Sequence, residues 1–181
     1  MGKEKLELME PTQALESEYL ALLDEFRAIG EPFHQDDDAP ARSDFGAFVK
    51  RLKRRARGLE LRDGEAPEHT FWLVRGGRLV GTSRLREYLR REVGMQKGHI
   101  GYYIRPSERG KGYATRLLSA TLEKAREAGL PQVLLMCAAS NPASAKVIEK
   151  NGGVLEGGIP KADREILRYW IDLSPARRQA G

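Results

Sequence analysis

Apolar residues in the N-terminal third of the chain recur at helical spacing. One predicted helix face carries apolar side chains at steps of four and three, namely Leu15, Tyr19, Leu22, Phe26 and Ile29. Thr12 can cap the start of this helix, and Gly30 ends it. A second helix is predicted from a cap at Ser43 to Gly58. The acidic segment 31–42 between the two helices is expected to be a mobile loop.

Strand patterns occur before the first predicted helix and again over residues 70–104. Residues 5–9 alternate polar and apolar side chains, which predicts a first strand. Residues 70–75 and 78–84 are rich in β-forming side chains and flank Gly76-Gly77, which predicts a β-hairpin. A further strand is predicted over 99–104.

Helical and strand patterns alternate in the C-terminal half. The helical pattern 114–128 is followed by the apolar run 133–138, which is typical of a strand buried on both faces. Asn141 can cap a short helix that runs to Lys150, and residues 166–173 read as a last strand. A strand–helix–strand crossover then lies within an otherwise antiparallel sheet. We therefore expect a mixed α/β fold, a mostly antiparallel twisted sheet with flanking helices.

Length and composition favour one domain, predicted over residues 1–173 with a disordered tail at 174–181. The chain has 181 residues, of which 40% are apolar and 31% charged, enough to build a core. No run approaches the roughly 18 apolar residues of a membrane helix, and no secretion signal opens the chain. Cys137 is the single cysteine and has no disulfide partner. We expect a cytoplasmic protein without a membrane partner.

The net charge of +5 suits an anionic small ligand and gives no reason to expect a nucleic-acid partner. Basic residues concentrate over 50–57. The simplest interpretation of this run is a solvated helix face, and a surface for an acidic partner is the alternative.

The loop from Arg109 to Ala114 carries the strongest chemical signal. Gly110 and Gly112 permit backbone angles that aim successive N–H groups at one point. The helix that follows adds its free amides and the positive end of its dipole, and Arg109 and Lys111 add full charges. The loop is thus predicted to bind a phosphate or pyrophosphate group.

Two common nucleotide motifs fail at named positions of this loop. A Walker loop needs Lys and then Ser or Thr directly after its last glycine. Here Tyr113, and not Lys, follows Gly112. A dinucleotide fingerprint needs a third glycine where Thr115 stands, and the next strand ends without the acidic residue that binds ribose.

The pattern Arg109-x-x-Gly112-x-Ala114, which follows Ile104-Arg105-Pro106, resembles the acetyl-CoA-binding motif of the GNAT (Gcn5-related) N-acetyltransferases. The order of helix and strand over 99–153 also matches that family. Asn141-x-x-Ser144 followed by Glu149-Lys150-x-Gly152 is similar to the version in ribosomal-protein N-terminal acetyltransferases.

This resemblance implies an enzyme that transfers the acetyl group of acetyl-CoA to a primary amine by direct attack in a ternary complex, without a metal. The acceptor would be a small molecule or a peptide, and a homodimer is compatible with the resemblance. The cofactor would contact the strand before the loop, the loop itself and the last helix, at Tyr102, Tyr103, Ile104, Arg109, Gly110, Lys111, Gly112, Tyr113, Ala114, Thr115 and Asn141.

The sequence departs from the family at the general acid. Many members carry a tyrosine on the last helix, where this chain has Ile148, and Gly153 replaces the usual aromatic residue. Ser144, one turn earlier, is the catalytic substitute that the resemblance suggests, and packing against the sheet is the alternative role of this serine. The missing tyrosine keeps a second hypothesis open, a non-catalytic acyl-CoA-binding or regulatory module.

His99 is the candidate general base, because the family places a base near this strand. Strand parity could instead turn its side chain away from the site. Asp163 and Glu165 are alternatives as base, His34 and His69 could line the acceptor side, and water could take the proton without a dedicated base. Cys137 is expected to be a core thiol.

Overall fold

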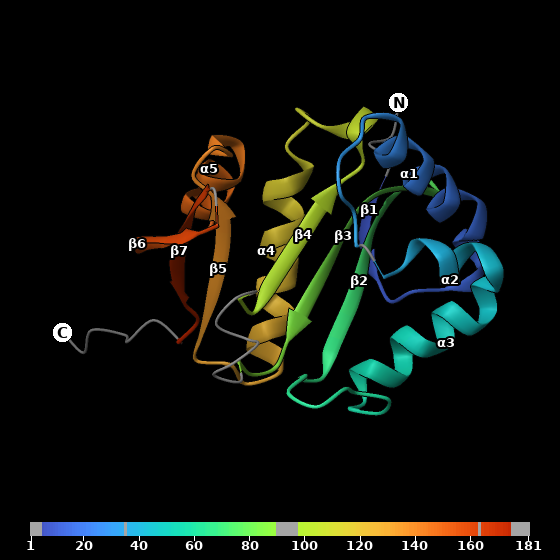
Figure 1. The fold of residues 1–181 in the computed structure, drawn as a ribbon, viewed down its shortest axis with the longest axis horizontal. Helices are drawn as coiled ribbons and strands as arrows, with labels where there is room; N and C mark the ends of the chain where they lie inside the picture. Colours follow the sequence, from blue (N-terminus) through green and yellow to red (C-terminus); the bar gives the residue numbers. More distant parts are fainter. Residues whose placement is uncertain (1–4, 35, 90–97, 163, 175–181) are drawn as a thin grey trace.

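The computed structural model describes residues 5–34, 36–89, 98–162 and 164–174. In this part of the chain one sheet of seven strands has the order β1-β2-β3-β4-β5-β7-β6 (Figure 1). The strands are β1 (Leu6–Met9), β2 (Glu68–Arg75), β3 (Arg78–Arg86), β4 (Ile100–Ile104), β5 (Gln132–Ala138), β6 (Val154–Lys161) and β7 (Arg164–Asp172). The helices are η1 (Gln13–Leu15), α1 (Glu16–Ala28), α2 (Asp38–Ser43), α3 (Phe45–Ala56), η3 (Pro106–Glu108), α4 (Tyr113–Glu127) and α5 (Pro142–Lys150).

Side chains on the two faces of the sheet pack into different cores. Along β2, Trp72 and Val74 join the core formed with α1, α2 and α3, whereas Phe71 joins the core formed with α4 and α5. This alternation is what a strand of period two requires when helices cover both of its faces. We call the side of α1, α2 and α3 the N-terminal face and the side of α4 and α5 the C-terminal face (Figure 1).

Strands β4 and β5 are the only parallel neighbours in the described sheet, and they diverge. Their register holds a single pair, Ile100 with Leu135, and His99 N donates to Leu134 O at 2.7 Å just before it. Beyond Ile100 the two strands separate, as Figure 1 shows. The backbone of β4 from Gly101 to Ile104 therefore lacks ladder partners on the β5 side.

The predicted fold class is confirmed, and so are the hairpin around Gly76-Gly77, the crossover helix and the buried strand after it. Asn141 caps α5 as predicted, because its Oδ1 accepts from Ser144 N at 3.1 Å. Strand β6, which the sequence analysis did not predict, forms the edge of the sheet beside β7.

Three N-terminal predictions are wrong in detail. Ser43 ends α2, and the cap of α3 is Asp44, whose Oδ1 accepts from Ala47 N at 2.8 Å. Ile29 is 48% exposed, because α1 ends at Ala28 before this residue reaches the core. The segment 31–42 is not all loop: it contains most of α2, and Asp37 within it is buried.

The basic run 50–57 lies on α3 and its C-terminal end. Its exposed members face solvent as predicted, while Arg54 pairs with Glu60 at 2.6 Å and Arg55 with Glu65 at 3.1 Å. Among the described helices, none has the length and apolar character needed to cross a bilayer. Residues 175–181 of the predicted tail lie outside the described residues.

Candidate active site

The glycine loop forms a turn that opens onto the first turn of α4. Gly110 and Gly112 have φ values of +74° and +78°, a region that glycine adopts at little cost. Arg116 N makes the first backbone bond into the helix, to Gly112 O, and Gly112 provides no side-chain cap. The amides of the residues between them point out of the helix start without helical partners, so the loop offers a row of N–H donors.

The charged side chains of the loop turn away from that row of amides. Arg109 makes a two-pronged contact with Glu31, at 2.8 and 2.6 Å, and lies over the ring of Phe26. Lys111 Nζ contacts Glu108 Oε2 at 2.9 Å and Ser107 O at 3.1 Å. Anion binding at this loop therefore falls mainly to its backbone amides and the dipole of α4.

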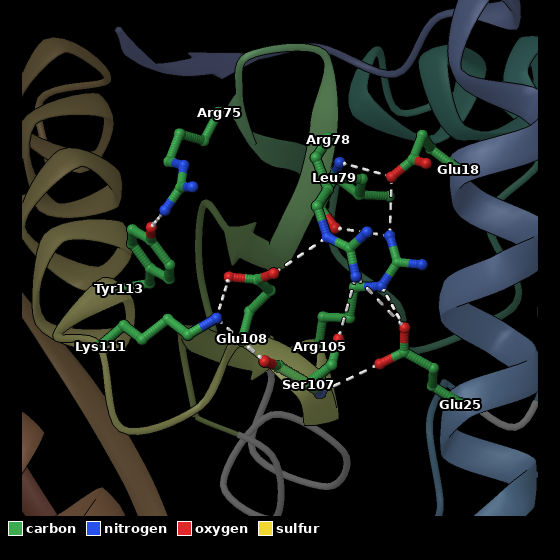
Figure 2. Close-up of polar contacts among 10 residues, drawn as sticks. All are labelled: Glu18, Glu25, Arg75, Arg78, Leu79, Arg105, Ser107, Glu108, Lys111 and Tyr113. Atoms are coloured by element: carbon green, nitrogen blue, oxygen red, sulfur yellow. Dashed lines mark hydrogen bonds and ion pairs between the residues drawn. The ribbon is translucent and has the colours of Figure 1, made fainter. Parts of the chain in front are cut away.

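A buried arginine fixes the entry to the loop against α1 (Figure 2). The side chain of Arg105 is 4% exposed and donates to Glu18 at 2.7 Å and to Glu25 at 2.6 Å. Glu25 also accepts from Ser107 N at 3.0 Å. Burial alone would raise the pKa of Glu25, but the hydrogen bonds from Arg105 and Ser107 hold that pKa below its ordinary value. The loop is thus anchored before any ligand binds.

The end of the β2–β3 hairpin contributes two arginines that the sequence pattern did not single out. Arg78 contacts Glu108 at 3.0 Å, and Arg75 donates to the hydroxyl of Tyr113 (Figure 2). The hydrogen bond from Lys111, with Arg78 nearby, holds the pKa of Glu108 below its usual range. No local motif marks these arginines, because their role depends on how the hairpin packs against the loop.

The hydroxyl of Ser144 meets that of Tyr102 across the opening between β4 and β5. The two oxygens lie 2.8 Å apart, and both side chains are half-buried on the C-terminal face. Burial raises the pKa of Tyr102 to about 12, so its phenol keeps its proton at neutral pH. The structure therefore pairs the predicted serine with a tyrosine that comes from β4, not from the last helix.

Core packing accounts for the missing helix tyrosine. Ile148 is 1% exposed and fills the core between α5 and the sheet. At Gly153 an added Cβ would lie 2.4 Å from Ile148 Cγ2 and 2.9 Å from Ile148 O. The isoleucine and the glycine thus fit each other, and position 153 has no room for an aromatic side chain.

His99 holds the start of β4 against β5. Its Nδ1 accepts from Leu134 N at 2.9 Å, and its ring packs edge-on against Trp170. Burial, reinforced by Arg86, lowers the pKa of His99 to about 4. One ring nitrogen is therefore already engaged by the backbone, and the neutral imidazole is a weaker base than the unperturbed value near 6.5 suggests.

We expect His99 to affect the pH dependence of stability more than that of catalysis. Because its folded pKa lies below the unfolded value, the unfolded chain binds more protons between about pH 6.5 and 4, and stability should fall as the pH drops through that window. Urea unfolding at a series of pH values should show this fall, and His99→Gln should reduce it. An inflection of kcat/KM near pH 6.5 that His99→Gln removes would instead support a catalytic base.

The other candidate bases lie in different surroundings. His34 Nε2 lies 3.4 Å from Thr82 Oγ1 on the N-terminal face, beside the ring of Tyr103. His69 pairs with Glu87 at 2.7 Å and lines a cavity of about 430 Å³ at the C-terminal end of α4, far from the loop at its start. Glu165 is exposed on β7, and Asp163 lies outside the described residues.

Cys137 is buried at the end of β5, and burial raises the pKa of its thiol. This matches the expectation of a core thiol. Within the described residues, no group of three or more His, Cys, Asp or Glu side chains is arranged to hold a metal ion.

Comparisons with known proteins show the family and the fold to which the chain is similar. The family model described as "Acetyltransferase (GNAT) domain" matches residues 23–154. The L-methionine sulfoximine/L-methionine sulfone acetyltransferase of Pseudomonas aeruginosa is 33% identical over 72 residues, which are 40% of this chain and 41% of that protein. The chain thus spans less than half the length of this curated relative.

Solved structures share the fold over nearly the whole chain. The ribosomal-protein-S5-alanine acetyltransferase of Vibrio fischeri superimposes with a TM-score of 0.70 at 16% identity, covering 96% of each chain. The YncA protein of Salmonella typhimurium, solved with its cofactor acetyl-CoA, gives 0.68 at 14% identity, covering 97% of this chain and 99% of its own. Since the family model covers more than half of the sequence and the fold agrees throughout, the chain belongs to the GNAT acetyltransferase family.

Proposed function

We propose that the protein transfers the acetyl group of acetyl-CoA to a primary amine, and that residues 1–173 form the single domain that does so. The observation that carries this proposal is the row of free amides at the start of α4 beside the divergence of β4 from β5. The amine nitrogen forms a bond to the thioester carbonyl carbon, the C–S bond breaks, and sulfur leaves with the electron pair. The amine gives up one proton.

The loop from Arg109 to Thr115 would hold the pyrophosphate. Its amides supply the donors, and Gly110, Gly112 and Ala114 leave the approach free of large side chains. Lys111 and Arg109 would contribute charge from a distance, since both are paired with carboxylates.

Pantetheine would add to the unpaired edge of β4, where the backbone of Tyr102, Tyr103 and Ile104 lacks ladder partners on the β5 side. A backbone amide there can also stabilise the carbonyl oxygen as negative charge develops on it. Asn141 lies exposed at the start of α5, on the other side of the opening, where its amide can contact the cofactor.

Ser144 would donate a hydrogen bond to the leaving sulfur. The hydroxyl of Tyr102 would orient Ser144 through the contact between the two oxygens. We propose that water, and not His99, takes the proton of the amine, because Leu134 N occupies one nitrogen of His99 and its pKa is about 4. The hydroxyl pair of Tyr102 and Ser144 beside the opening between β4 and β5 supports an enzyme over a non-catalytic acyl-CoA-binding module.

Two measurements test the proposal. Acetyl-CoA should raise the melting temperature of the protein progressively with its concentration, because it binds only the folded chain. Release of the CoA thiol should then accelerate when a panel of amino acids, polyamines and N-terminal peptides is added. A melting shift without thiol release from any amine would favour the binding module, and no shift at all would refute the cofactor assignment.

A further inference from the structure

An arginine cluster lies on the N-terminal face of the sheet, next to β4. Arg84 and Arg86 on β3 and Glu68 on β2 point to this face, where Asp37 and Arg51 meet them from the helical layer. Asp37 is 3% exposed and Glu68 6% exposed, so the cluster is largely shielded from water.

The two carboxylates of the cluster already have their partners. Asp37 accepts from the hydroxyl of Tyr19 at 3.0 Å and from Arg84, and Arg51 lies 3.5 Å from its other oxygen. Glu68 contacts Arg84 at 3.4 Å through one oxygen and Arg86 at 2.5 Å through the other. No carboxylate oxygen of the cluster is left to bind a cation.

The unmatched groups of the cluster are all donors. The Nε atoms of Arg84 and Arg51 are buried without a hydrogen-bond partner in the described part of the chain. Three guanidinium groups also face only two carboxylates there, which leaves one positive charge in excess. A buried donor without a partner is unfavourable and the excess charge is positive, so the cluster is suited to an anionic group.

The nearby histidines, His34 and His99, do not change the net positive charge of the cluster. Burial, with Arg84 and Arg86 nearby, lowers the pKa of His34 well below its ordinary value, and burial with Arg86 lowers the pKa of His99 to about 4. Both rings are thus neutral at pH 7 and add no charge to the cluster.

The cluster borders the part of β4 where acetyl transfer is proposed. Arg84 stands directly opposite Gly101 in the register of β3 with β4, and Thr82 stands opposite Tyr103. A side chain added at Gly101 would meet nothing within 4 Å, so there is open space beside this strand. An acceptor placed over Gly101 would have the unpaired edge of β4 on one side and the arginines on the other.

We propose that the amine acceptor carries a carboxylate, as a free α-amino acid does, and that Arg84 and Arg86 bind this carboxylate beside Gly101. The inference rests on the proposed acetyl transfer and specifies its substrate class. A polyamine fits the cluster poorly, because the acidic oxygens that would bind its second ammonium group are already occupied by arginines.

The test compares an amino acid with its uncharged carboxamide and with a polyamine. L-Methionine sulfone, its α-carboxamide and spermidine are assayed for kcat/KM with the full chain at pH 7.5. We expect the free acid to exceed the carboxamide by about ten- to a hundredfold, as expected for a charged hydrogen-bonded contact. The carboxamide has the lower amine pKa and offers more free amine, so a site without charge preference would favour the carboxamide.

Variants then assign the preference to the cluster. Arg86→Gln should reduce the acid-to-carboxamide ratio, which is independent of the fraction of folded enzyme, and Arg126→Gln on the exposed face of α4 should leave it unchanged. Gly101→Val should raise KM for the acid while acetyl-CoA still shifts the melting temperature.

Equal rates for acid and carboxamide, faster acetylation of spermidine, or an unchanged ratio in Arg86→Gln would overturn the inference and leave the proposed acetyl transfer intact. If acetyl-CoA neither binds nor reacts with any amine, the proposed function fails first.

Discussion

Replacing Gly112 by aspartate is expected to weaken acetyl-CoA binding about a hundredfold. Gly112 ends the loop at the point where the free amides of α4 begin, and an added Cβ would meet nothing within 4 Å, so the carboxylate can extend toward the bound pyrophosphate. Two like charges about 5 Å apart repel by about 3 kcal/mol at an effective dielectric constant of 20, which corresponds to about two orders of magnitude in Kd. Isothermal calorimetry with acetyl-CoA measures this loss.

Gly112→Asn is the matched control, because asparagine has the same shape without the charge. Both variants place a side chain at a φ of +78°, which Asn and Asp tolerate better than other residues, so their backbone strain is similar. The difference between their affinities isolates the charge and should shrink at high salt. Equal affinities of the two variants and the native protein would contradict a pyrophosphate site at this loop.

Sequence patterns predicted the elements that depend on local chemistry. Gly110 and Gly112 need positive φ angles, and Asn141 followed by Pro142 makes a helix start, whatever the rest of the chain does. The apolar run of β5 likewise follows from its burial on both faces. Each of these features depends on residues that are close together in the sequence, so it can be predicted without knowing the register of the sheet.

The parts that the sequence did not predict depend on contacts between distant segments. Asp36, Asp37 and Asp38 are alike in the sequence, yet only Asp37 is buried, because Arg84 and Tyr19 meet it there. Arg105 reads as an ordinary basic residue until α1 brings two glutamates to it. Such roles are set by strand register and helix packing. A register shift of one residue moves every side chain of a strand to the other face of the sheet, so the sequence pattern alone does not predict these contacts.

The same reasoning applies to the general acid. A search for a tyrosine on the last helix finds Ile148, and the family resemblance then leads to Ser144 alone. Tyr102 was expected to contact the cofactor, and its hydroxyl reaches Ser144 because β4 and α5 face each other across the strand opening. The roles of Ser144 and Tyr102 in catalysis are therefore best tested together.

Ser144→Ala is expected to lower kcat about ten- to a hundredfold while acetyl-CoA affinity changes little. The loss lies at the low end of acid–base catalysis, because a thiolate of ordinary pKa near 8.5 is already a fair leaving group. Tyr102→Phe should lower kcat by a smaller factor, since its phenol, with a pKa of about 12, acts by orienting the serine and not by ionising. Steady-state kinetics and calorimetry separate the effect on kcat from the effect on binding.

The double variant decides whether the two hydroxyls act as one unit. If Tyr102 works through Ser144, Tyr102→Phe should cost little further rate once Ser144 is alanine, and the two effects should be clearly non-additive. Ser144→Thr keeps a hydroxyl and should restore much of the rate, whereas Ser119→Ala, on the exposed side of α4, should have no effect. Additive losses would show that Tyr102 acts independently of Ser144, unchanged rates would make Ser144 a packing residue, and a loss of affinity alone would make Ser144 a cofactor contact.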